Sequence, residues 1–198
     1  MEQIQIQAFG FSEMYEWKEV QENPLGKFVT FSSDVPNKIV PFGKNEDDYC
    51  LGITTINSVV DSDDPKEYHN KYKKNHLGDL YLEKERLAVG TKVYDENMEL
   101  SFIRTYPWEH LIPIVDNEFD ESKKYVSRSN RKEWVRVNII GKAIVVDNGK
   151  CASGSFCTPY VGEDTTLFGT AVPATTESKN KFYVLERISD KTILVLNK

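Results

Sequence analysis

Two groups of charged and aromatic residues, far apart in the sequence, could carry out acid–base chemistry. The first is residues 12–17 (SEMYEW), and the second is residues 125–134 (YVSRSNRKEW). A carboxylate can take up or release a proton, and an arginine guanidinium can hold a carboxylate through two hydrogen bonds. We therefore expect the two segments to fold side by side, so that Glu13 meets Arg128 or Arg131.

The acidic residues of the first group also have structural interpretations. Glu13 is a candidate catalytic acid, but ion pairs that only hold a fold perturb carboxylates in the same way. Glu16 lies three residues further on, so on an extended strand it faces the opposite side and is expected to be structural. Ser12 could be a nucleophile, although no histidine or lysine base is evident beside it.

The second group likewise has two interpretations. Arg128 and Arg131 could orient a carboxylate during a reaction, or they could form an ion pair with Glu133 that holds the fold. Trp134, and Trp17 of the first group, are expected to lie in the core or at a subunit interface. These residues are predicted to support the site around Glu13.

The composition narrows the class of protein. The chain has 198 residues, of which 12% are aromatic, with ten Tyr and ten Phe, a composition that favours strands. A formal charge of −6 argues against general affinity for nucleic acid. The sequence has no signal peptide and no apolar run long enough to cross a membrane. We expect neither nucleic acid nor a membrane as a partner.

No metal or cofactor is expected. The three histidines lack the spacing of a zinc site, and the acidic run at 61–64 lacks the glycine and distal glutamate of an EF-hand. A P-loop sequence is absent. The odd number of cysteines favours reduced thiols, with a Cys151–Cys157 bridge left open.

Alternating apolar and polar residues predict a series of short strands. In the first part of the chain these cover residues 3–7, 27–32, 38–41 and 49–60, and residues 11–17 are interpreted as a strand or a bend. Further on, the strongest covers 135–146, and others cover 155–158, 167–172, 181–187 and 192–196. Residues 147–149 (DNG) predict a tight hairpin. The pattern favours a mainly β fold, with antiparallel sheets in a sandwich or barrel-like arrangement.

One short helix is predicted near residues 65–76. Asp64 can cap it and Pro65 suits its first position. The acidic and aromatic segment 79–120 has no clear period, and we interpret it as a long excursion with one or two irregular strands. Residues 1–9 are expected to form an N-terminal strand, and residues 10–198 a single β-rich domain.

The order of these motifs resembles the intramolecular chaperone autocleavage domain of some phage tail-spike and neck-appendage proteins. That family is classed with self-cleaving peptidases of the glutamic type. The matching segments are the acid–aromatic residues 13–17, the strands at 28–30 and 51–53, and residues 125–159, which contain the arginines and a Gly-x-Cys turn. The resemblance spans residues 10–172 in the expected order.

This resemblance implies a domain that trimerises, helps an attached fibre or spike to fold, and cuts itself off. It places the scissile bond between Phe9 and Gly10 and makes Glu13 the catalytic glutamate. The family has an aspartate three residues before that glutamate, where this chain has Gly10. Hydrolysis of an amide needs both a base for the nucleophile and an acid for the leaving nitrogen, so we predict that self-cleavage is slow or lost.

The leading hypothesis is therefore a viral assembly module, a homotrimeric chaperone-like domain of a tail spike, an appendage or a capsid component. Its partners would be an upstream spike or fibre domain or other virion proteins, in the virion or the infected-cell cytoplasm. The nine residues before the junction suggest either a piece of a longer protein or a free-standing particle subunit. The alternatives are an active self-cleaving peptidase that cuts near Phe9–Gly10, and a β domain that binds glycans or a host surface.

Overall fold

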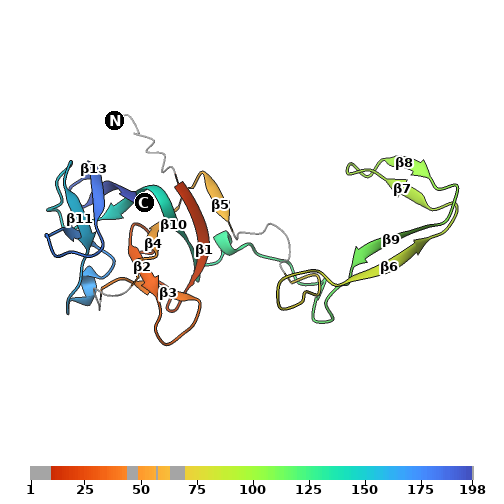
Figure 1. Cartoon of the computed structure of the whole chain (residues 1–198), viewed down its shortest axis with the longest axis horizontal. Coiled ribbons are helices and arrows are strands. Elements are labelled where there is room, and N and C mark those ends of the chain that lie inside the picture. Colours follow the sequence, from red (N-terminus) through yellow and green to blue (C-terminus); the bar gives the residue numbers. More distant parts are fainter. Residues whose placement is uncertain (1–9, 44–48, 57, 63–69, 198) are drawn as a thin grey trace. The chain divides into compact units, whose positions relative to one another are not determined.

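The computed structural model describes residues 10–43, 49–56, 58–62 and 70–197, which are almost all β structure (Figure 1). The sequence predicted a single domain over 10–198, but the chain divides into two compact units. Unit 1 combines Met1–Lys66 with Val126–Lys198, and unit 2 is Glu67–Tyr125. The segment between the two parts of unit 1 thus forms a unit of its own. The predicted strand at 3–7 lies outside the described residues.

Unit 1 is built on one continuous sheet. Its strands are β1 (Gly10–Trp17), β2 (Phe28–Phe31), β3 (Lys38–Pro41), β4 (Gly52–Thr55), β5 (Val60–Ser62), β10 (Trp134–Val146), β11 (Phe156–Pro159), β12 (Ala171–Pro173), β13 (Phe182–Ser189) and β14 (Thr192–Asn197). Strands β10, β4, β2, β3 and β1 follow one another, and a further β1–β10 pairing closes them into a barrel. The predicted barrel-like fold is confirmed. The pairs β1–β3 and β1–β5 are parallel, so the barrel is mixed.

Strand β10 joins the barrel to the rest of unit 1. Over its 13 residues it pairs first with β1 and β4, and then with β14 from Gly141 onward (Figure 1). Gly141 is opposite both Gly10 and Asn197, so the start of β1 and the end of β14 meet at one point on β10. Its φ of 115° is a left-handed value that favours glycine at this change of partner.

Two apolar clusters stabilise unit 1. One lies in the barrel, among β1, β2, β3 and β10. It contains Trp17, Val29, Ile39, Leu51, Val135 and Val137. The other lies between β2, β4 and the strands β10 to β14, and includes Phe28, Ile53, Phe182, Val184, Ile193 and Val195. Because residues of β10 contribute to both, this strand connects the two cores.

The tight hairpin predicted at residues 147–149 is wrong. Strand β10 pairs with β14 and not with β11, which follows it in sequence. The carboxylate of Asp147 instead accepts hydrogen bonds from the Cys151 amide (3.1 Å) and from the Arg187 guanidinium (2.8 Å). The side chain that suggested a turn therefore ties the end of β10 to β13.

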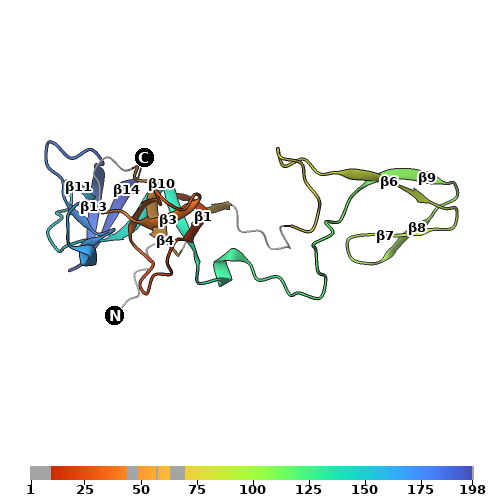
Figure 2. The same ribbon diagram turned by 90° about the horizontal axis from the view of Figure 1, so that it is seen from below.

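Unit 2 contains more strands than the one or two predicted. They are β6 (Leu82–Leu87), β7 (Lys92–Tyr94), β8 (Leu100–Ile103) and β9 (Trp108–Pro113). Strand β6 pairs antiparallel with β9, and β7 pairs antiparallel with β8, which gives two successive two-stranded sheets (Figure 2). Unit 2 is therefore a long β-hairpin, which we call the arm.

The helix predicted near 65–76 is not found where the structure describes this segment. Residues 65–69 lie outside the described part, and residues 70–76 are extended, with antiparallel bridges from Tyr72 to Val115 and from Lys74 to Leu80. The Asn75 side chain accepts hydrogen bonds from the amides of Leu77 and Asp79. Such local side-chain bonds compete with helix formation, which explains the difference.

Candidate functional site

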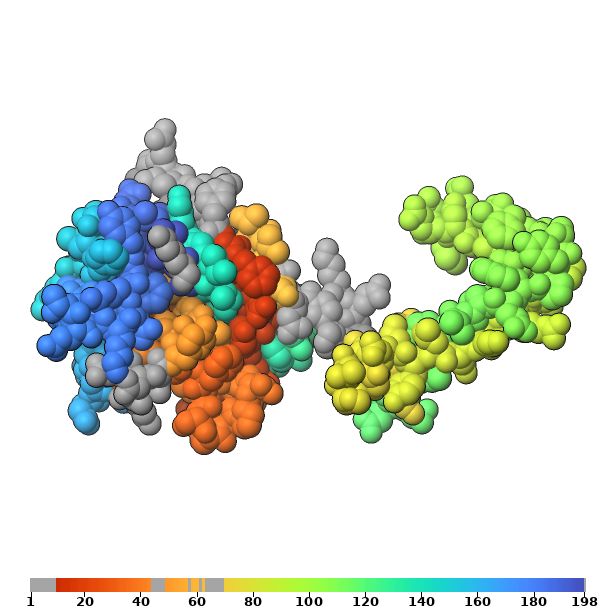
Figure 3. Space-filling model, in the orientation of Figure 1, coloured from red at the N-terminus to blue at the C-terminus, as the bar shows by residue number. Residues whose placement is uncertain are grey.

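The two segments that suggested chemistry do lie side by side. Strand β1 runs antiparallel to β10 along almost its whole length, with Glu13 opposite Val137 and Glu16 opposite Trp134. Figure 3 shows β1 (red) at the surface directly against β10 (teal). The register shifts between Phe11 and Ser12, where β10 has one extra residue, Ile139, so the β-bulge lies on β10. The predicted adjacency of the segments is confirmed.

The carboxylate of Glu13 is half-buried and held by a neighbour on its own strand. The Tyr15 hydroxyl donates a hydrogen bond of 2.8 Å to Glu13 Oε2. Residues two apart on a strand share a face, which makes this contact possible. Glu13 lies three residues after Gly10, roughly 10 Å along an extended strand, which is farther than its side chain reaches. On a bond before Gly10 it could act only through a water or from another subunit.

Within the described part of the chain, no hydrogen bond or ion pair joins either arginine to Glu13. The guanidinium of Arg128 lies 4.0 Å from the centre of the Trp134 ring, and Arg131 lies 5.4 Å from it. Arg131 also pairs with Glu133 at 4.0 Å. The register explains this result, because Trp134 is opposite Glu16 and the arginines precede it. The arginines therefore lie beyond the C-terminal end of β1. Their contacts with Trp134 and Glu133 favour the structural interpretation.

The remaining residues of the first group also have structural contacts. Glu16 accepts an ion-pair hydrogen bond from Lys38 at 2.8 Å, which joins β1 to β3. Trp17 is 2% exposed and belongs to the barrel core. The structural roles predicted for both residues agree with these contacts.

Gly10 begins β1 and has little space around it. Its carbonyl oxygen accepts hydrogen bonds from the Ser58 hydroxyl (2.7 Å) and the Val59 amide (3.1 Å). A methyl group added to its α-carbon would overlap the Asn138 side-chain amide and the Ile140 carbonyl oxygen. The packing here thus requires glycine, and no carboxylate could be carried by residue 10 without movement of β10.

Comparison with known proteins places this arrangement in a family. The family model Peptidase_G2, the IMC autoproteolytic cleavage domain, matches residues 4–185. The chain belongs to this IMC autoproteolytic cleavage family. The resemblance inferred from the motifs is therefore confirmed. Among curated proteins, none matches the chain.

Two solved structures have the same fold as this chain. The pre-mature gene product 12 of bacteriophage phi29 matches with a TM-score of 0.68 and 20% identity, over 97% of this chain and 22% of that one. A C-terminal fragment of the same phage protein matches with a TM-score of 0.64 and 21% identity, over 95% of this chain and 99% of the fragment. The chain thus spans about a fifth of the pre-mature phage protein chain and nearly all of the C-terminal fragment.

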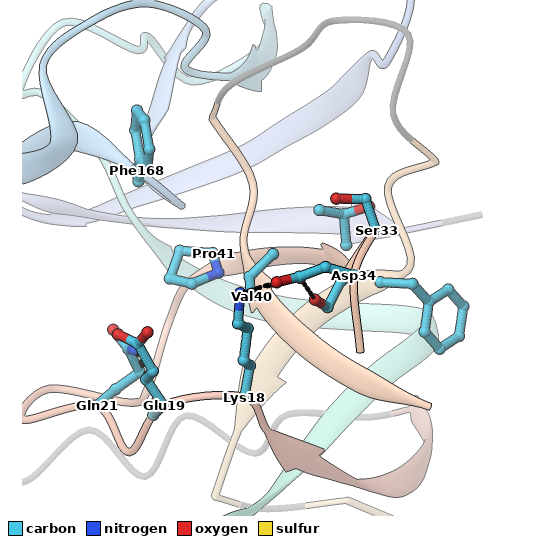
Figure 4. A pocket seen from close by; sticks show the side chains of 11 residues that line it. Lys18, Glu19, Gln21, Ser33, Asp34, Val40, Pro41 and Phe168 are labelled. Carbon is cyan, nitrogen blue, oxygen red and sulfur yellow. Dashed lines mark hydrogen bonds and ion pairs between the residues drawn. The ribbon is translucent and has the colours of Figure 1, made fainter. Parts of the chain in front are cut away.

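One pocket of about 510 Å³ lies beside strands β2 and β3 (Figure 4). In Figure 4 the side chains of Lys18 and Asp34 point toward one another, and they form an ion pair of 2.6 Å. Hydrogen bonds from Lys18 and from Ser32 lower the pKa of Asp34 from 3.8 to about 2. The two charges neutralise each other, so the pocket has no strong charge and we assign it no ligand.

The cysteines are free thiols, as the odd number predicted. Burial raises the pKa of Cys50 to about 12. A hydrogen bond with Cys151, together with burial, raises the pKa of Cys157 above its usual 9.0. The Cys50 and Cys157 thiols are therefore protonated at neutral pH and unreactive as nucleophiles.

Other classes of site are not evident in the part of the chain that the structure describes. No group of His, Cys, Asp or Glu there could hold a metal ion. No helix among the described residues is long and apolar enough to span a membrane.

Two residues that contact Glu13 and Gly10 were not predicted from the sequence. Tyr15 holds Glu13, and the alternation of the strand could have revealed this pair. Asn138 packs against Gly10, but only the register between β1 and β10 brings these residues together. No local sequence signal could have identified Asn138.

Proposed function

We propose that this protein is a trimerising chaperone-type domain of a phage spike or appendage, with slow self-cleavage between Phe9 and Gly10. Membership of the IMC autoproteolytic cleavage family supports the assembly role. The likeness to the C-terminal fragment of the phage phi29 protein supports a place at the end of a longer virion protein. The exposed apolar residues of the arm support the proposed trimer.

The arm exposes many apolar side chains. On its strands these include Leu82, Leu100, Phe102, Ile103, Trp108 and Leu111. Among residues 70–125, which the structure describes, the one buried side chain is that of Arg104, stacked 3.8 Å over the Trp108 ring. Two-stranded hairpins with no core of their own are at best marginally stable in water. We infer that copies of the chain cover these apolar residues in a trimer.

Substitution of exposed apolar residues in the arm tests this proposal. We expect the unmodified chain to elute as a trimer of about 68 kDa, three times the 22.8 kDa chain. Leu100→Thr with Leu111→Thr keeps strand-forming residues but removes apolar surface. The trimer of this variant should dissociate at a protein concentration at least about tenfold higher. Size exclusion with light scattering over a dilution series measures both.

Two exposed residues of unit 1 supply the control. Val20→Thr with Val161→Thr replaces two exposed apolar residues outside the arm by the same polar residue. This variant should dissociate like the unmodified chain. A monomeric unmodified chain, or equal dissociation of the two variants, would argue against trimerisation through the arm.

Slow self-cleavage follows from the position of the acids. Gly10 offers no carboxylate, and the strand geometry separates Glu13 from the proposed bond by roughly 10 Å. The intact mass of the purified chain should therefore remain that of residues 1–198 for days, with a minor species that begins at Gly10. Glu13→Gln is nearly isosteric but cannot take up a proton, so it should change the mass spectrum little.

The active peptidase is the alternative that the same spectra can detect. Rapid and complete conversion to a species that begins at Gly10, abolished by Glu13→Gln, would support it. That result would contradict the slow cleavage proposed for this chain.

A further inference from the structure

We propose that Asn138 is the residue that keeps self-cleavage slow, because its neutral carboxamide occupies the space beside Gly10 where an acid would have to act. The inference rests on the proposed cleavage between Phe9 and Gly10. It adds a specific residue on β10 and predicts that a single substitution there accelerates the reaction.

Asn138 and Ser12 form a buried polar pair. They are opposite each other on β10 and β1, and both are fully buried. Within the described part of the chain, Ser12 Oγ and both polar atoms of the Asn138 side chain have no hydrogen-bond partner. Unpartnered buried polar groups are rare and destabilising, so their presence calls for an explanation such as a functional role.

The carboxamide of Asn138 lies against Gly10, the residue after the proposed cleavage point. A β-carbon at position 10 would overlap Asn138 Nδ2, so this nitrogen lies directly against the α-carbon of Gly10. The nitrogen of Gly10 is the group that would leave on cleavage, and it is bonded to that same α-carbon. Asn138 is therefore much closer to the proposed bond than Glu13, which lies three residues along the strand.

Both sides of this contact are held in place. The Asn197 side chain donates hydrogen bonds to the carbonyl oxygens of Asn138 (2.9 Å) and Ile139 (2.8 Å), at the bulge of the β1–β10 ladder. On β1, the Gly10 carbonyl is bound by Ser58 and Val59. A group at position 138 is thus fixed with respect to Gly10, as acid–base catalysis requires.

The chemistry needs an ionisable group at this place. In hydrolysis, a water oxygen bonds to the carbonyl carbon of Phe9 and loses a proton to a base. The bond from that carbon to the Gly10 nitrogen then breaks, and the nitrogen gains a proton from an acid. A carboxamide can do neither at neutral pH, whereas a carboxylate of the same size can take the proton from water and return it to the amine.

The test compares the full chain with Asn138→Asp. In Asn138→Asp we expect the species that begins at Gly10 to form on the order of 100-fold faster than in the unmodified chain, as intact mass spectrometry over time would show. Asn148→Asp makes the same chemical change on the exposed turn after β10 and should have no effect. Gly10→Asp should not accelerate cleavage, because its β-carbon overlaps Asn138.

A second variant covers the case in which Asn138→Asp does not fold. Asn138→Asp with Ser12→Ala keeps the acid on β10 and removes the unpartnered hydroxyl opposite it, and it should also cleave faster. If a folded, trimeric form of either variant cleaves no faster than Asn148→Asp, the inference is overturned. The inference is also overturned if neither variant folds, because Ser12 and Asn138 would then have a structural role.

The cleavage rate of the unmodified chain distinguishes a failure of the proposed slow self-cleavage from a failure of the role given to Asn138. Rapid cleavage of the unmodified chain would contradict both the slow self-cleavage proposed above and the role of Asn138. Slow cleavage of the unmodified chain with equally slow cleavage of folded Asn138→Asp would overturn only the role of Asn138.

Discussion

Asp147→Ala is expected to lower the free energy of unfolding by about 3–5 kcal/mol, the usual cost of removing one partner of a buried ion pair. The Asp147 side chain is fully buried and the Arg187 side chain is 29% exposed. Arg187 donates to both oxygens of Asp147, at 3.2 and 2.8 Å, and also to the Cys151 carbonyl. Without the carboxylate, the Cys151 amide and the Arg187 guanidinium lose this buried acceptor. Chemical denaturation would measure the loss of stability.

An exposed ion pair provides the control for this substitution. Asp34 pairs with Lys18, but its side chain is 63% exposed. Asp34→Ala should therefore change the free energy of unfolding far less than Asp147→Ala does. Equal effects of Asp34→Ala and Asp147→Ala would contradict the role given to the buried pair.

The contribution of Asp147 should also depend on pH. Burial alone would raise its pKa, but the hydrogen bonds from Arg187 and from the Cys151 amide outweigh burial and hold the pKa below the usual 3.8. A carboxyl group with a lowered pKa stabilises the fold fully above its unfolded value, and this contribution is lost as the pH falls through the folded value. The stability difference between Asp147→Ala and the unmodified chain should therefore shrink below pH 3.8.

Trp17→Ala is expected to have an effect of similar size, about 3–5 kcal/mol, because it leaves a cavity in the barrel core. The side chain is 2% exposed and packs in the cluster that contains Val29, Ile39 and Val137. Its backbone amide also bonds to the Glu133 carbonyl at 2.7 Å, which closes the barrel between β1 and β10. Thermal and chemical denaturation would measure the loss.

Trp108→Ala is the matched control, since Trp108 is 45% exposed on the arm. It should leave the unfolding of unit 1 unchanged, because Trp108 belongs to unit 2. If Trp108→Ala destabilised unit 1 as much as Trp17→Ala, the role given to the barrel core would be wrong.

The sequence predicted the strands of the barrel because their apolar residues alternate. Residues 135–139 alternate and form the start of β10, and residues 11–17, which were expected to be a strand or a bend, form β1. The burial of Trp17 agrees with the expectation that this residue lies in the core or at an interface. Residues 147–149 were misinterpreted, because a turn sequence does not reveal that Asp147 binds Arg187, 40 residues further on.

The geometry of the site depended on register, which a single sequence does not encode directly. The pairing of Glu13 with Val137 and of Glu16 with Trp134 decides that the arginines lie away from Glu13. The same register places Asn138 against Gly10. Long-range pairing of this kind arises from packing of the whole barrel, so residue types and spacing alone predicted the neighbouring strands but not the neighbouring side chains.

The arm was difficult to predict for a different reason. Its strands have exposed apolar residues on their surfaces, such as Leu100 and Leu111, so they lack the alternation of a half-buried strand. If partner chains cover these residues, as we propose, the pattern reflects an assembly rather than a single chain. The segment then has no reason to resemble a strand of a monomeric domain.

Native mass spectrometry of the full chain tests the proposed function most directly, because one spectrum reports both the number of subunits and the first residue of each. The account predicts a trimer whose subunits mostly retain residues 1–9, with a minor fraction that begins at Gly10. A monomer, or a trimer made up mostly of subunits that begin at Gly10, would contradict it.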